Sequence, residues 1–175
     1  VEEAIATAAH TFDEARRLPI HVRADALDHI SRRLAESIDE NAELIAKEGG
    51  KPLKWAKVEA TRAVSTFRWA SEILRRGDDE LIRLDTEASL GSRVGLIRRF
   101  AYGPVLGITP FNFPLNLVAH KVAPSLAVGA PIVVKPASLT PLSLLRLAEI
   151  LLEAGLPEGA MSVLPGPGSS VGNAL

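Results

Sequence analysis

Three short segments hold polar or flexible residues in settings where a protein could use them for chemistry. In GITPFNFPLN, at residues 107–116, Asn112 stands between two phenylalanines and two prolines. Lys135 directly follows a short apolar run, and residues 165–172 are rich in glycine. Amide and ammonium groups donate hydrogen bonds, and glycine lets the backbone approach a ligand closely. Each segment also has a plainer explanation: a turn or cap asparagine, a solvated lysine at a strand end, and a strand-to-helix turn.

Other catalytic chemistries find little support. The chain has no cysteine, which excludes disulfides, thiolate metal sites and thiol nucleophiles within it. The four histidines do not show metal-ligand spacing with carboxylates, so we expect no metal site. The serines have no base at the spacing of a catalytic triad.

Length and charge indicate an ordinary globular protein. The 175 residues suit about one domain, and 47% of them are hydrophobic. The net charge of −1 offers no field to attract nucleic acid or an anionic membrane, so neither partner is expected. The apolar runs are shorter than the roughly 20 residues of a membrane helix, and the acidic, amphipathic start does not resemble a signal peptide. We therefore expect a cytoplasmic protein.

The first half of the chain predicts helices. Apolar residues recur every three or four positions over residues 1–17, from Ala24 to about Gly49, and over Leu53–Arg76, with Pro19 separating the first two helices. The face that the third helix is expected to bury contains Trp55, Val58, Ala63, Phe67, Ala70 and Leu74.

The second half alternates strands with helices. Strands are expected at residues 81–85, 93–100, 104–108, 131–135 and 161–164, and helices at 116–128 and 140–154. Thr140 is expected to cap the last helix because it precedes Pro141. The nearly all-apolar strand at 131–135 is typical of a parallel strand buried on both faces.

This alternation predicts an α/β fold with βαβ units in a doubly wound parallel sheet. Ligands of such sheets bind at the carboxyl ends of the strands, where residues 109–114, 135–138 and 165–172 should converge. Two or three parallel strands would leave open sheet edges, so we expect the sheet to be incomplete in this chain.

Two stretches resemble the aldehyde dehydrogenase superfamily, and the resemblance extends over essentially all 175 residues. One is ITPFNFPLNLVAHKVAPSLAVGAPIVVKPASLTPLSLLRLAEILLEAGLPEGAMSVLPG, and the other is EGGKPLKWAKVE, which is similar to the family pattern E-x-GK-P-x-x-E-A-x-x-E. The resemblance implies that residues 1–80 form the helical part of a Rossmann-like cofactor domain. Residues 81–175 would supply the strands and first βαβ units of its NAD(P)-binding part.

The resemblance also implies roles for single residues. The amide of Asn112 would donate to the oxyanion of a thiohemiacetal, in a site that the neighbouring prolines and phenylalanines fix and keep dry. Lys135 would contact the adenosine ribose. Ser138 stands where many NAD-using members carry a glutamate that would repel a 2′-phosphate, so NADP is slightly favoured over NAD. The implied cofactor-binding residues are Ile108, Thr109, Pro110, Phe111, Asn112, Lys135, Ala137, Ser138, Gly166 and Gly172.

Two further residues could contact an anionic substrate group. Arg68 is a natural partner for a phosphate or phosphonate, and His120 lies in the stretch that resembles family branches acting on lactaldehyde, phosphonoacetaldehyde or a triose phosphate. The plainer alternatives are a helix-face salt bridge for Arg68 and a satisfied core hydrogen bond for His120.

The family's cysteine nucleophile, glutamate base, pyrophosphate turn and oligomerising flap are expected beyond residue 175. The resemblance therefore implies part of an NAD(P)-dependent, homo-oligomeric enzyme that oxidises an aldehyde to a carboxylate, with this chain alone inactive. The alternative is a noncatalytic remnant that acts as a binding or assembly module.

Overall fold

The computed structural model describes residues 1–77 and 79–175. Its helices are α1 (Glu2–Arg17), α2 (Ile20–Glu36), α3 (Ile38–Gly49), α4 (Leu53–Arg76), α5 (Asn116–Val128) and α6 (Leu142–Leu152), with short helical turns at Ala88–Leu90 and Gly168–Gly172. Its strands are β1 (Glu80–Arg83), β2 (Val94–Ile97), β3 (Val105–Ile108), β4 (Ile132–Lys135) and β5 (Met161–Val163). None of the helices in the described part is long and apolar enough to cross a membrane.

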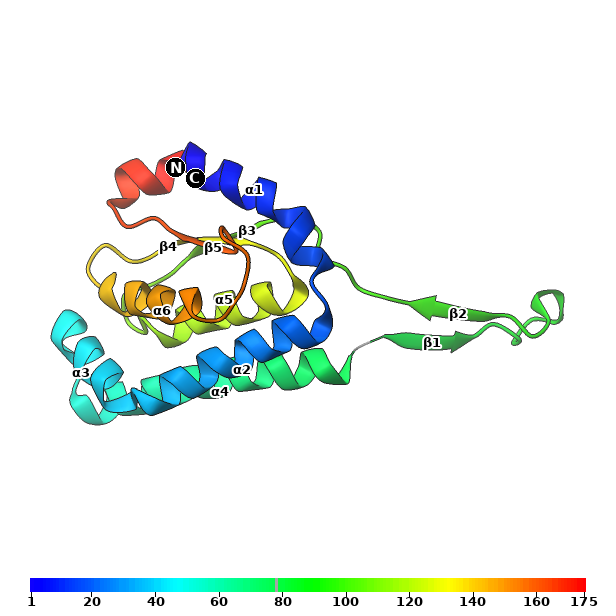
Figure 1. The fold of residues 1–175 in the computed structure, drawn as a ribbon, viewed down its shortest axis with the longest axis horizontal. Coiled ribbons are helices and arrows are strands. Elements are labelled where there is room, and N and C mark those ends of the chain that lie inside the picture. Colours follow the sequence, from blue (N-terminus) through cyan, green and yellow to red (C-terminus); the bar gives the residue numbers. More distant parts are fainter. Residues whose placement is uncertain (78) are drawn as a thin grey trace.

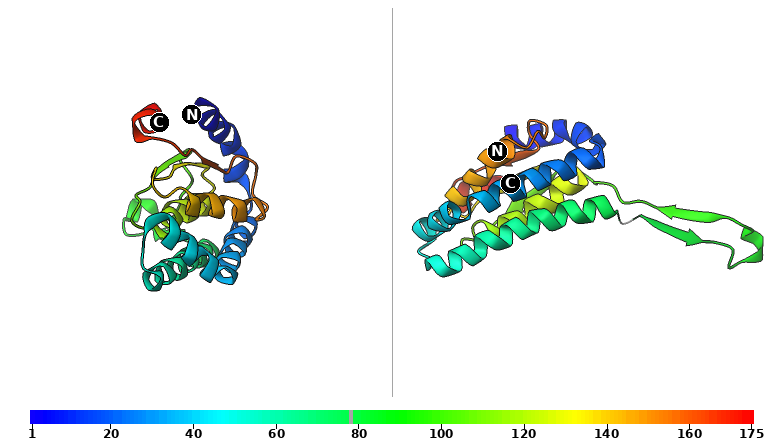
Figure 2. Two further views of the ribbon diagram at one scale, coloured as in Figure 1. Left: turned by 90° about the vertical axis from the view of Figure 1, so that its left-hand side faces the viewer. Right: turned by 60° about the horizontal axis from the view of Figure 1, so that its bottom comes forward.

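Strands β3, β4 and β5 form a parallel sheet in that order, with α5 and α6 as the crossovers. The sheet lies between α1 on one face and α5 and α6 on the other, and α2 and α4 form a further layer beyond (Figure 1 and Figure 2). Every residue of the central strand β4 is buried, as the apolar run predicts. The predicted α/β fold is confirmed.

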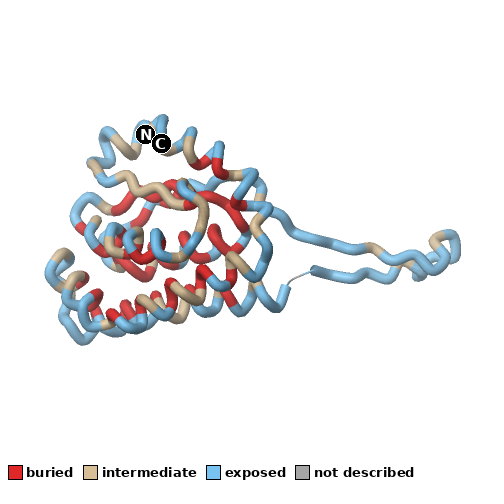
Figure 3. The backbone as a smooth tube through the Cα atoms, in the orientation of Figure 1, coloured by how far each residue is buried: buried red, intermediate tan, exposed pale blue. Residues whose placement is uncertain are grey.

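The core lies between the sheet and the layer of α2 and α4, as the buried segments in Figure 3 show. Helix α5 passes through this region and is apolar on nearly all sides, because it packs against both β3 and α4. Phe67 of α4 and Val118 of α5 are fully buried there. On α4 the predicted face is only partly right, since Trp55 and Val58 are 58% and 45% exposed.

In one region the structure has two helices, α2 and α3, where the sequence predicts a single helix. The structure divides the expected helix from Ala24 to Gly49 at Ser37, which has φ −114° and ψ 27°, and α2 already begins at Ile20. The Ser37 hydroxyl donates to the carbonyl of Arg33 at 2.8 Å and accepts from the Asn41 amide at 2.9 Å. Serine can compete for backbone hydrogen bonds in this way, while the apolar period continues across the break.

Strands β1 and β2 form a separate antiparallel hairpin rather than joining the parallel sheet. The hairpin extends away from the rest of the molecule (Figure 1) and is largely exposed (Figure 3). Leu81, Val94 and Leu96 are 59–69% exposed on it. Alternation along β2 therefore does not mark a buried face.

Candidate functional site

The carboxyl ends of the parallel strands bring the three predicted segments together. The amide of Thr109, directly after β3, donates to the carbonyl of Lys135 at 3.1 Å. The hydroxyl of Ser138, after β4, donates to the carbonyl of Gly166 at 2.9 Å, which joins the second segment to the third. The predicted convergence of these loops at one edge is confirmed.

Lys135 ends the central strand and is only 5% exposed. Its ammonium group donates to the carbonyl of Pro136 at 3.0 Å, and its side chain lies against Gly172, where an added Cβ would be 3.7 Å from Cε. Within residues 1–77 and 79–175, no carboxylate pairs with this ammonium group. A buried cation with donors to spare suits a ligand rich in hydroxyl or phosphate oxygens, so the donor set fits the ribose of a dinucleotide.

The loop with Asn112 leads from β3 to α5 and is open to solvent. Asn112 is exposed, and the neighbouring Phe111 is 61% exposed. The expectation that flanking aromatic rings keep this amide dry is therefore wrong for the surface this chain forms. An exposed amide at the end of a parallel strand is free to meet a group that another part of a protein presents.

What fixes the loop is a lysine from the helical part of the chain. The ammonium group of Lys51 donates to the carbonyl of Asn112 at 2.6 Å and lies 4.0 Å from the ring centroid of Phe113. Lys51 also pairs with Glu59 of α4, whose side chain is fully buried. The carboxylate of Glu59 accepts from the amides of Leu115 and Asn116, at 3.0 and 3.2 Å. It thus serves the free amides at the start of α5, where negative charge is favourable.

A second carboxylate caps α6 in the same manner. Glu48 of α3 accepts from the amides of Leu142 and Ser143, at 2.7 and 3.1 Å, and from the Ser143 hydroxyl. The prediction that Thr140 caps this helix is wrong. The Thr140 hydroxyl donates instead to the carbonyl of Phe111 at 3.5 Å. Both Glu48 and Glu59 therefore reach from the helical part to the loops at the sheet edge.

Sequence reasoning assigned no role to Glu48, Lys51 or Glu59, although all three lie in EGGKPLKWAKVE. A signal was present for Glu59, because it follows Ala56 by three residues and precedes Ala63 by four, on a face that is otherwise apolar. A charged residue on such a face needs a partner, and a lysine eight positions earlier in the chain supplies it.

The two speculative substrate residues are not in the same place. Arg68 is exposed and forms the ion pair of its plainer alternative, with Glu72 at 3.4 Å. His120 is exposed rather than held in the core, and it lies in an open cleft of about 380 Å³ between α4 and α5. The other lining residues are Arg62, Ser65, Thr66, Trp69, Ala70, Ile73 and Pro124. The arginine that shares this cleft with His120 is thus Arg62.

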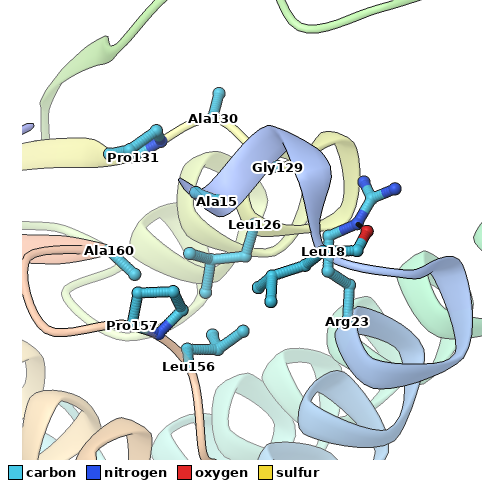
Figure 4. Close-up of a pocket in the computed structure, with 10 residues that line it drawn as sticks. All are labelled: Ala15, Leu18, Arg23, Leu126, Gly129, Ala130, Pro131, Leu156, Pro157 and Ala160. Carbon is cyan, nitrogen blue, oxygen red and sulfur yellow. Dashed lines mark hydrogen bonds between the residues drawn. The ribbon is translucent and has the colours of Figure 1, made fainter. Parts of the chain in front are cut away.

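The opposite edge of the sheet is closely packed. A small cavity there has a volume of about 10 Å³. Figure 4 shows the residues that line it, among them Ala15, Leu126 and Ala160. Gly129 lies beside it with φ +79°, and an added Cβ would be 2.7 Å from the carbonyl oxygen of Ala15. A space of this size holds at most about one water molecule, so it is not a site for a dinucleotide.

Comparison with known proteins identifies the family. The aldehyde dehydrogenase family model matches residues 1–175. Aspartate-semialdehyde dehydrogenase 1 of Pseudomonas canavaninivorans is 40% identical over 158 residues, which are 90% of this chain and 33% of that protein. Lactaldehyde dehydrogenase of Methanocaldococcus jannaschii is 39% identical over an alignment of 178 positions, which covers 99% of this chain and 37% of that protein.

A solved structure shows the same similarity in three dimensions. The glyceraldehyde-3-phosphate dehydrogenase of Methanocaldococcus jannaschii, in complex with NADP, superposes with a TM-score of 0.91 at 39% identity, over 98% of this chain and 37% of that one. The chain thus spans about a third of the length of the relatives it matches. Since the family model matches the whole chain and the fold superposes on a solved relative, the chain belongs to the aldehyde dehydrogenase family.

Proposed function

We propose that this chain supplies the first part of the cofactor site of an NAD(P)-dependent aldehyde dehydrogenase, which oxidises an aldehyde to a carboxylate. The observation that carries the proposal is the sheet edge where the buried, incompletely paired Lys135 lies beside the loop of Asn112. The similarity to aldehyde-oxidising relatives supports the reaction class.

In the proposed reaction, a cysteine thiolate from outside this chain attacks the aldehyde carbon, and the carbonyl oxygen becomes an oxyanion. The exposed amide of Asn112 donates a hydrogen bond to that oxygen and lowers the barrier to its formation. A dinucleotide held by Lys135 and Ser138 would supply the oxidant that takes up the hydride leaving the same carbon, and a thioester would remain. Water then displaces the thiolate and yields the carboxylate. Asn112 is exposed on the surface that this chain forms, so in this proposal the aldehyde and the cysteine would have to reach the amide from another part of the protein.

Lys135 and Ser138 would receive the adenosine ribose of the dinucleotide. NADP is the favoured cofactor because Ser138 carries no charge and Lys135 is positive, so neither repels a 2′-phosphate. A relative of the same fold binds NADP, which agrees with this assignment. Gly166 and Gly172 would let the turn after β5 lie close to the adenine side.

The test uses the full-length protein that contains this sequence, with NADP or NAD and a panel of neutral and anionic aldehydes. We expect aldehyde-dependent formation of reduced dinucleotide. In Asn112→Ala, kcat should fall by about 10² to 10³, the typical effect of losing one oxyanion donor, with unchanged thermal unfolding. A wild-type protein that reduces neither dinucleotide, or an Asn112→Ala variant with full kcat, would overturn the proposal.

A further inference from the structure

A buried ion pair outside the strand-end loops holds the segment that carries Asn112. Lys51 contacts the segment through the Asn112 carbonyl, at 2.6 Å, and through the Phe113 ring, at 4.0 Å. Glu59 contacts it through the amides of Leu115 and Asn116. The pair therefore touches four of the five residues from 112 to 116 and leaves only Pro114 without a direct contact.

Burial makes this pair a stiff support. The side chain of Glu59 is 0% exposed and that of Lys51 is 17% exposed. A buried carboxylate is costly unless a cation and hydrogen-bond donors surround it, and here one ammonium group and two backbone amides do so. Displacing the loop would break the hydrogen bonds that Lys51 and Glu59 make with it. The free energy lost in this way opposes movement of the loop relative to the pair.

The outer side of the loop offers no comparable restraint. Phe111 and Asn112 are exposed, and the contact of Thr140 with the Phe111 carbonyl is long, at 3.5 Å. The orientation of the Asn112 peptide therefore depends on its carbonyl bond to Lys51. Because the carboxamide is attached to that peptide by only two rotatable bonds, fixing the peptide limits where the carboxamide can point.

We propose that Lys51 and Glu59 are positioning residues, which aim the Asn112 amide by fixing the peptide and the helix start on either side of it. The proposal rests on the proposed function, in which that amide meets an oxyanion. Displacing a catalytic group by about 1 Å can lower a rate about 10²-fold, so the pair should affect kcat without touching substrate.

The first experiment measures kinetics of the full-length protein. Lys51→Met should lower kcat about tenfold or more, with each KM within about twofold. Lys51→Arg retains a charged donor and should lie closer to wild type. Lys54→Met is the matched control, because Lys54 is exposed and its ammonium group lies 5.6 Å from the Trp55 ring centroid, away from the Asn112 loop; it should not change kcat.

A double-mutant cycle separates positioning from general damage. In an Asn112→Ala background, Lys51→Met should change kcat by less than about twofold, since the amide that it orients is gone. Loss of the same factor in both backgrounds would show that Lys51 acts independently of Asn112 and would overturn the proposal. Unchanged kcat in the single variant would also overturn it.

Hydrogen exchange of the full-length protein tests the support without an activity assay. In Glu59→Gln, the amides of Leu115 and Asn116 should exchange about tenfold faster or more, while those of Leu142 and Ser143, which Glu48 holds, keep their rates. If Glu59→Gln does not fold, Lys51→Met takes its place in this measurement. Unchanged exchange at Leu115 and Asn116 overturns the proposal. If the wild type reduces no dinucleotide but exchange responds as expected, the proposed reaction fails and the support of the loop stands.

Discussion

Ser138 is the residue whose hydroxyl joins two of the loops at the sheet edge. It is exposed, and it donates to the Gly166 carbonyl at 2.9 Å. The same hydroxyl can still accept a hydrogen bond, for which a ribose hydroxyl is a suitable donor. Ser138 therefore shapes the edge and, in the proposed function, also faces the part of the cofactor that distinguishes NADP from NAD.

Replacing Ser138 by glutamate should reverse the cofactor preference. A carboxylate at this position would accept bonds from both ribose hydroxyls of NAD but repel the 2′-phosphate of NADP. We expect the ratio of kcat/KM for NADP to that for NAD to fall about tenfold or more, which is about 1.4 kcal/mol of discrimination. Steady-state kinetics of the full-length protein with both cofactors measures it.

Ser138→Ala is the matched control for this prediction. It removes the bond to Gly166 without adding charge, so it should weaken binding of both cofactors to a similar extent. A glutamate variant that retains the wild-type ratio, or an alanine variant that shifts the ratio as far, would contradict a role of charge at this position.

The sequence predicted which residues lie near the strand ends. It did not predict the distant residues whose hydrogen bonds fix the loops at those ends. Asn112 lies in the loop after one predicted strand, and Lys135 is the last residue of another, so their neighbourhood follows from the position of the strand ends. Glu48 and Glu59 lie 94 and 56 positions before the amides that they accept from. Only tertiary packing brings such distant residues together, and local periodicity contains no information about which helix start a carboxylate will face.

Helix α6, like α5, depends on a distant residue. Its start has no side-chain cap from its own segment, and Glu48 of α3 accepts from the amides of Leu142 and Ser143. This arrangement joins α3 to the crossover between β4 and β5, directly after the loop of Lys135 and Ser138. The end of α6 is tied in a similar way, since Arg33 of α2 donates to the carboxylate of Glu153 at 2.8 Å and lowers the pKa of that group.

Removing the Glu48 carboxylate should loosen the first turn of α6. Glu48→Ala is expected to destabilise this turn by about 1 kcal/mol, the usual cost of a lost cap, and so to speed exchange of the Leu142 and Ser143 amides about fivefold. Hydrogen exchange followed by mass spectrometry measures it. Glu43→Ala is the control, because Glu43 lies on the same helix and pairs only with the exposed Lys47. Equal effects of the two variants would contradict capping by Glu48.

Elements were predictable where one environment surrounds the whole segment. Strand β4 is buried along its full length and most residues of helix α5 are buried, and their compositions predict their bounds within a residue. The break between α2 and α3 was not visible, because Leu34 and Ile38 keep the apolar spacing while Ser37 ends the helix through its hydroxyl. Strands were expected near β1 and β2, but their separate, exposed hairpin was not predicted, because exposed and buried strands can share the same alternation.

At the scale of the whole molecule, the proposed ligand edge is one-sided. Ile108 and Phe111 are 55% and 61% exposed, while Lys135 behind them is buried. A site that encloses a ligand needs a second wall, and this chain provides loops from one sheet edge only. Its length, about a third of that of its relatives, agrees with such a one-sided site.

The isolated 175-residue chain should therefore bind dinucleotides poorly and oxidise no aldehyde. It has no cysteine to form a covalent intermediate, and an open surface recovers little of the free energy that association costs. Titration of NADPH fluorescence should show no saturation below about 1 mM, which corresponds to only about 4 kcal/mol of binding. The full-length protein serves as the positive control under the same conditions. Micromolar binding by the isolated chain would instead favour the noncatalytic binding module, because the loops of one sheet edge would then suffice to hold the nucleotide.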